Sequence, residues 1–118
     1  MKDFTIEFTR HEKILEVNNS MCHNYYYLQY GRIYNKDRTE FRRFKFVEWA
    51  DIDDICDYYD KDFVTNQEIS SCMEEYAWAT CESQADYLIK SFDECDAFYD
   101  WCNKTIKDFN GMEGRNYG

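Results

Sequence analysis

The spacing of apolar residues changes near residue 50, from the alternation of strands to the repeat of helices. In residues 4–9 the apolar side chains fall on even positions, which makes one face of an extended strand apolar. Beyond this point Ile52, Ile55 and Tyr59 recur at the spacing that places them on one face of a helix. Strands followed by helices predict an α+β domain rather than an alternating α/β fold.

The first half of the chain predicts four antiparallel strands. Turns are expected at 10–12, where the charged Arg-His-Glu interrupts the alternation, and at 18–20 and 35–38, where Asn, Asp and Ser favour turns. Arg42 and Arg43 interrupt the alternation in the last strand, which predicts a β-bulge there. The expected strands cover residues 4–9, 13–17, 25–34 and 40–49.

The second half predicts three helices. Asp51 is positioned to cap the first helix, and Thr65 with Glu68 forms a capping box for the second. Ser83 is the expected cap of the third helix, and Gly111 lies where this helix would end. The expected fold is a four-stranded antiparallel sheet followed by three helices packed on one face. It forms one domain over residues 1–111, with a sheet half (1–49), an acidic helical half (50–111) and a flexible tail (112–118).

Composition sets the expected environment. The chain has 118 residues, which suffice for one buried core. It becomes charged directly after Met1 and contains no long apolar run, so we expect no signal region and no membrane span. The six cysteines lie mostly at core spacing, which predicts reduced, buried thiols. We therefore expect a cytoplasmic protein. The absence of proline and the abundance of Tyr, Phe, Asn, Ile and Lys favour an AT-rich bacterial or mobile-element genome.

Charge is divided between the two halves. Residues 1–46 carry nine Lys/Arg and six Asp/Glu, a net of +3, and residues 47–118 carry five and eighteen, a net of −13, which together give −10. Such an excess of carboxylates repels nucleic acid and membrane surfaces and attracts proteins with a basic groove.

The acidic residues of the second half form stripes opposite the apolar faces of the expected helices. Carboxylates spaced along a helix can imitate a row of phosphates, because one helical turn rises about 5 Å and DNA is densely charged. Tyr58 and Trp78 are the expected apolar anchors among them. The full expected partner-binding set is Glu48, Asp51, Asp53, Asp54, Asp57, Tyr58, Asp60, Asp62, Glu74, Glu75, Trp78, Asp93, Glu94, Asp96 and Asp100.

A simpler interpretation of the same stripes is a solubilising surface with favourable acids near helix N-termini. It accounts for Asp51, Asp53 and Asp54. It accounts less well for Asp57 and Asp60 of the first helix, and for Asp93, Asp96 and Asp100, which line up on the expected third helix. Few lysines interleave with these acids, and like charges on one helix face are destabilising.

No catalytic, metal or cofactor pattern is present. Residues 51–62 resemble a calcium loop only superficially, because Ile55 and Cys56 replace the required oxygen ligand and glycine. The cysteines lack the short pairs of zinc sites, and Cys22 beside His23 does not make an oriented nucleophile pair. We therefore expect neither an enzyme nor a cofactor.

A basic run interleaved with aromatic residues occupies residues 30–45. Such a pattern can bind single-stranded nucleic acid, yet a net charge of −10 opposes direct DNA binding. The run is either a strand surface that balances the acidic helices or a secondary contact to a partner or to RNA held by that partner. Its expected contact residues are Arg38, Arg42 and Arg43.

A small, acidic, proline-free, aromatic-rich domain without catalytic residues resembles phage-encoded inhibitors of bacterial defence, and most of all anti-CRISPR proteins. The resemblance is one of size, charge and architecture over the whole chain, and no motif carries it. It implies a target among RNA-guided nucleases in the host bacterial cytoplasm, which hold nucleic acid in a positively charged channel. The alternative is an acidic docking or regulatory module for a cytosolic partner unrelated to nucleic acid.

Overall fold

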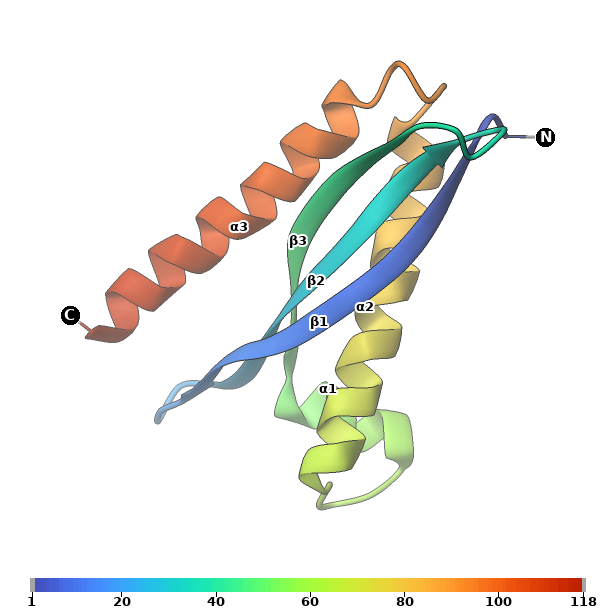
Figure 1. Ribbon diagram of the computed structural model, residues 1–118. Coiled ribbons are helices and arrows are strands. Elements are labelled where there is room, and N and C mark those ends of the chain that lie inside the picture. The colour runs from blue at the N-terminus through green and yellow to red at the C-terminus, as the bar shows by residue number, and fades with distance from the viewer. Residues whose placement is uncertain (1, 118) are drawn as a thin grey trace.

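The computed structural model describes residues 2–117, with the side chains of residues 2–111. A three-stranded antiparallel sheet in the order β1-β2-β3 is followed by three helices, as Figure 1 shows. The α+β class is confirmed, but the sheet has three strands and not four. The elements are β1 (Phe4–Asn18), β2 (His23–Asn35), β3 (Phe41–Asp51), α1 (Ile52–Tyr59), α2 (Asn66–Leu88) and α3 (Asp96–Tyr117).

Strand β1 is one continuous strand where the sequence predicts two strands and a turn. Its pairing with β2 shifts between Phe8 and Arg10 and again between Lys13 and Leu15. Each bulge inserts one residue and exchanges the two faces of the strand. The two bulges together cancel, so the even-numbered Phe4, Ile6 and Phe8 and the odd-numbered Leu15 and Val17 lie on opposite faces of the sheet. This change from even to odd positions resembles a turn in the sequence. The expected bulge at Arg42 and Arg43 is wrong, because β3 pairs with β2 without interruption.

The boundary between the second and third helices also differs from the expectation. Helix α2 continues through Ser83 to Leu88, and α3 begins only at Asp96. The buried stripe of Ala77, Cys81 and Ala85 keeps this part of α2 on the sheet, so Ser83 does not act as a cap. Helix α3 extends to Tyr117, past the expected end at Gly111. The flexibility of residues 112–118 stays a prediction.

Two apolar clusters lie on opposite faces of the sheet. The larger cluster joins one face to α1, α2 and the first turns of α3, with Tyr27, Phe46 and Phe98 fully buried. The smaller cluster contains Val17, Tyr26 and Val47 and is covered by Ile106 and Phe109 of α3. The helices therefore do not all pack on one face, because α3 passes from one face to the other around β3.

Helix α3 seals the outer edge of β3. The Thr105 hydroxyl accepts a hydrogen bond from the Val47 N–H at 3.0 Å, and the Tyr99 hydroxyl donates to the Arg43 carbonyl at 2.7 Å. An open edge strand presents unpaired backbone groups that template aggregation. Figure 1 shows α3 running beside β3, while α2 crosses behind the sheet.

Candidate functional site

Helix α1 presents a group of exposed carboxylates that we call the acidic end. Asp51 caps this helix by accepting a hydrogen bond from the Asp53 N–H at 2.7 Å. Ile55 faces the core, so the acids point outward. The Tyr58 hydroxyl donates to Glu75 of α2, which brings a carboxylate of the second helix to the same end. The acidic end consists of Asp53, Asp54, Asp57, Asp60, Asp62 and Glu75.

The acidic end lacks compensating cations. Among the described residues, none of its six carboxylates forms an ion pair. Lys61 lies nearby in sequence, but its ammonium binds Glu68 at 2.7 Å. This hydrogen bond holds the pKa of Glu68 below its usual value. The negative field of the acidic end is therefore left open to an external partner.

Asp60 is placed at a local cost to stability. It is the C-cap of α1 and adopts the left-handed conformation, with φ at 53°. Glycine or asparagine usually occupies this position, and a carboxylate there meets the negative end of the helix dipole. Local choices that oppose the fold are most often found at functional positions.

Asp51 stays beside the acidic end as the cap of α1, but the predicted acids before and on α3 do not join this surface. Asp93 and Glu94 belong to the loop before α3, so the expected stripe with Asp96 and Asp100 is not formed on one helix. This loop lies at the other end of the molecule from α1 (Figure 1), which measures 48 Å in its longest dimension. Glu74 of α2 is also separate from the acidic end, because its carboxylate faces β1, 3.5 Å from the ring nitrogen Nδ1 of His11.

Both expected aromatic anchors have ring partners: Tyr58 meets Tyr59 and Tyr76 edge-on, and Trp78 packs on β1. Its indole stacks on Phe8 of β1, with ring centroids 5.4 Å apart, although 37% of the residue stays exposed. Tyr58 is 46% exposed and remains part of the acidic end. Tyr58 is therefore the anchor that the structure brings to the carboxylates.

A second charged surface lies on the sheet face opposite α2, beside the first turns of α3. We call it the basic face. Arg10 stacks over Tyr30 with its guanidinium carbon 4.1 Å from the ring centroid, and Arg38 stacks over Tyr34 at the same distance. The basic face consists of Arg10, Tyr30, Arg32, Tyr34, Arg38, Phe41, Arg43 and Lys45.

Arg42 and Arg43 do not act together. Neighbouring residues of a strand point to opposite faces, so Arg43 belongs to the basic face. Arg42 lies over the Phe92 ring at 4.8 Å and 3.8 Å from the Asp93 carboxylate. Of the three expected basic contacts, Arg38 and Arg43 share a surface and Arg42 is a structural contact to the loop before α3.

The basic face contains a shallow hollow lined by arginines. Its volume is about 420 Å³, and Arg10, Arg32 and Arg43 line it together with Tyr30. Arg32 and Arg43 are directly paired across β2 and β3, an arrangement that is destabilising for like charges. Three guanidinium groups around one hollow can hold a phosphate or another oxyanion.

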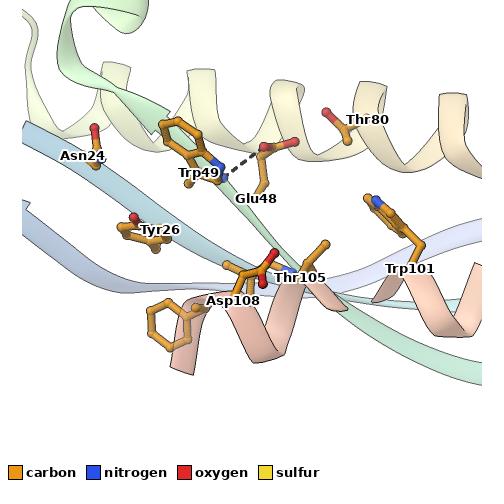
Figure 2. Close-up of a pocket in the computed structure, with 10 residues that line it drawn as sticks. Asn24, Tyr26, Glu48, Trp49, Thr80, Trp101, Thr105 and Asp108 are labelled. Atoms are coloured by element: carbon orange, nitrogen blue, oxygen red, sulfur yellow. Dashed lines mark hydrogen bonds between the residues drawn. The ribbon is translucent and has the colours of Figure 1, made fainter. Parts of the chain in front are cut away.

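Glu48 lines a separate cavity between α2 and α3. The cavity measures about 370 Å³ and is flanked by Trp49, Trp101 and Asp108, as Figure 2 shows. One carboxylate oxygen of Glu48 accepts from the Trp49 N–H at 3.0 Å. Burial raises the pKa of Glu48, and a hydrogen bond from Thr80 opposes that rise.

The sequence interpretation missed this cavity. Its residues Asn24, Glu48, Thr80 and Asp108 come from four separate elements, and only Glu48 was expected at a site. The interpretation also missed Arg10 on the basic face, because residues 10–12 were expected to form a turn. A longer strand interpretation of residues 4–18 would have placed Arg10 beside Tyr30.

The cysteines are free thiols. Cys72, Cys81, Cys95 and Cys102 are buried, while Cys22 and Cys56 are partly exposed. Burial raises the pKa of Cys102 to about 12, which keeps the thiol protonated and unreactive. Within residues 2–111, no group of three or more His, Cys, Asp or Glu side chains is placed to hold a metal ion.

No helix in the described part of the chain has the length and apolar character needed to cross a membrane. No protein-family model, curated protein or solved structure matches this sequence or fold.

Proposed function

We propose that this protein is a non-enzymatic inhibitor that docks its acidic end on the basic nucleic-acid groove of another protein and thereby excludes nucleic acid. The target class is an RNA-guided nuclease of a bacterial host, as the resemblance to anti-CRISPR proteins implies. The observation that carries the proposal is the uncompensated acidic end, six carboxylates without an ion pair among the described residues.

The arrangement of α1 supports this use. Its acids are exposed on a helix that is anchored through Ile55 and through Tyr59, whose hydroxyl donates to the Glu68 carbonyl at 3.0 Å. A rigid helix fixes the carboxylates relative to one another, so less conformational entropy is lost on binding. Tyr58 adds an amphipathic ring among them, a residue type enriched at binding hot spots.

The test is competition between this protein and nucleic acid. A panel of purified RNA-guided nucleases, each loaded with guide RNA and fluorescently labelled target DNA, is titrated with the protein, and anisotropy reports the release of DNA. We expect displacement from at least one member, weakening steeply as salt rises.

A matched pair of variants locates the surface. Asp53, Asp57 and Asp60 changed together to Asn should weaken displacement at least about tenfold, because clustered charges act collectively. Asp93, Asp96 and Asp100 changed to Asn remove the same charge from the opposite end, and we expect less than about a threefold effect. Equal losses in both variants would refute the acidic end as the surface, and retained DNA with excess protein would refute the competition.

A second candidate function is the binding of single-stranded nucleic acid on the basic face. The hollow lined by Arg10, Arg32 and Arg43 favours it, since stacked arginines and aromatic rings bind single strands with little sequence preference. Anisotropy of a labelled oligonucleotide with the protein alone tests it. Binding that is lost on changing Arg32 and Arg43 to Ser supports this candidate, and no binding at low salt excludes it.

A further inference from the structure

The cavity between α2 and α3 has aromatic walls. Its lining residues include Val47 of β3 and Thr105 of α3, which share a hydrogen bond. Trp49, Trp101, Tyr26 and Phe109 line it. Figure 2 shows the Glu48 side chain between Trp49 and Trp101. The faces of aromatic rings carry partial negative charge and attract cations.

The charged groups that line this cavity are the carboxylates of Glu48 and Asp108. Asn24 also lines it, but its Oδ1 atom, which has no hydrogen-bond partner among the described residues, is itself buried from solvent. The Thr105 hydroxyl is already occupied, because it also donates to the Cys102 carbonyl at 2.7 Å. A guest that satisfies these groups must donate hydrogen bonds and carry positive charge.

The cavity is only weakly neutralised by the chain itself. Asp108 lies 3.3 Å from the Lys104 ammonium, and both side chains are largely exposed, at 66% and 75%. An exposed pair of this kind contributes little and is easily exchanged. Glu48 has no ion pair among the described residues, and burial disfavours its charged form, so a bound cation would relieve that penalty.

A guanidinium group fits these features better than a metal ion or an ammonium. It has donors and no acceptors, binds a carboxylate through two parallel hydrogen bonds and stacks on an indole. The volume of about 370 Å³ lies at the lower end of small-ligand sites, which suits one side chain.

We propose that this cavity binds the guanidinium side chain of an arginine presented by the protein partner. The inference deepens the proposed function and rests on it for the source of the arginine. A groove that holds nucleic acid is rich in arginine. The cavity would add one specific anchor to the long-range attraction of the acidic end.

The test uses N-acetyl-arginine amide as the probe and N-acetyl-citrulline amide as its neutral control. Titration of the isotope-labelled protein is followed through the indole N–H signals of its three tryptophans. We expect the arginine probe to shift the signals of Trp49 and Trp101 and to leave Trp78, which stacks on Phe8, unchanged. Equal shifts with citrulline, or none with arginine, would overturn the proposal.

Two isosteric variants assign the binding to the carboxylates. Glu48→Gln and Asp108→Asn should each weaken probe binding about tenfold, as loss of one charge-assisted hydrogen bond predicts. The exposed Asp108 position keeps the test valid if the Glu48 variant does not fold. Unchanged affinity in a folded Asp108 variant would contradict the site.

The two proposals fail separately. The Asp53/Asp57/Asp60 variant should bind the arginine probe like the parent, because these residues lie outside the cavity. Probe binding without displacement of DNA from any nuclease would retain the cavity and reject the proposed function. Displacement of DNA without probe binding would retain the function and reject the cavity.

Discussion

The acidic end and the basic face are both charged surfaces, but they are constructed in opposite ways. The carboxylates of α1 stand apart from cations, whereas the arginines of the basic face are stacked on tyrosine and phenylalanine rings, as Arg10 is on Tyr30. The acidic end therefore projects a field, and the basic face holds its charges in fixed positions. Net charge alone therefore does not identify the surface that is available to a partner.

The largest expected effect comes from overpacking the core side of the sheet, behind the basic face. A Cβ atom at Gly31 would lie 2.7 Å from Cε1 of the Phe44 ring and 2.9 Å from the Glu7 carbonyl oxygen. Gly31→Ala should therefore lower the free energy of unfolding by about 1–3 kcal/mol, the usual effect of overpacking. Urea denaturation measures it. The Asp53/Asp57/Asp60 variant is the comparison at the other end, and it should unfold no more easily than the parent.

The next largest effect is a gain of stability at the acidic end. Asp60→Gly removes a side chain from the left-handed C-cap of α1 and a negative charge from the negative end of the helix dipole. We expect stability to rise by about 1 kcal/mol, with a loss of competition against nucleic acid. Thermal unfolding is the measurement, and Asp57→Gly, in the helix interior, is the control that should destabilise. A fall in stability for Asp60→Gly would show that its conformation is not costly.

The smallest expected effect concerns two tyrosine hydroxyls, Tyr58 at the acidic end and Tyr99 of α3, and it appears only at alkaline pH. The hydrogen bond to Glu75 raises the pKa of Tyr58 to about 12, and burial raises the pKa of Tyr99 to about 12, from 10.0. For a raised pKa, the stabilising contribution is complete below pH 10 and is lost as pH rises through about 12.

Between these pH values the free energy of unfolding, followed by circular dichroism, should fall less steeply with rising pH in Tyr58→Phe and in Tyr99→Phe than in the parent. Tyr87 is 82% exposed, so Tyr87→Phe is the control and should leave the alkaline profile unchanged. An unaltered profile in both test variants would exclude these hydroxyls as the cause.

Local signals in the sequence were reliable. The Asp51 cap and the capping box of Thr65 and Glu68 are confirmed, because both depend on residues within one turn. The acidic residues of α1 were also expected at their exposed positions, since the apolar spacing fixes which side of the helix is buried.

Features that depend on distant contacts could not be predicted. The two bulges of β1 keep one strand continuous between clusters on opposite faces of the sheet, and Gln29 supports the first bulge by donating to the Arg10 carbonyl at 2.7 Å. Ser83 resembles a helix cap, but burial of Ala85 against the sheet overrides it. The cavity between α2 and α3 unites Asn24 with Asp108, which only the path of α3 around β3 brings together.

The seal on β3 has a consequence for biosynthesis. The strands pair with sequence neighbours and can form early, but the groups that close the β3 edge, Tyr99 and Thr105, are made much later. At common translation speeds the ribosome needs about 3–11 s to pass from Asp51 to Thr105. During that interval each nascent chain carries an open edge, so neighbouring chains on one messenger RNA can cross-pair. Slow translation at low growth temperature and closely spaced ribosomes should therefore lower the yield of folded protein. C-terminal truncations before Thr105 should accumulate as aggregates.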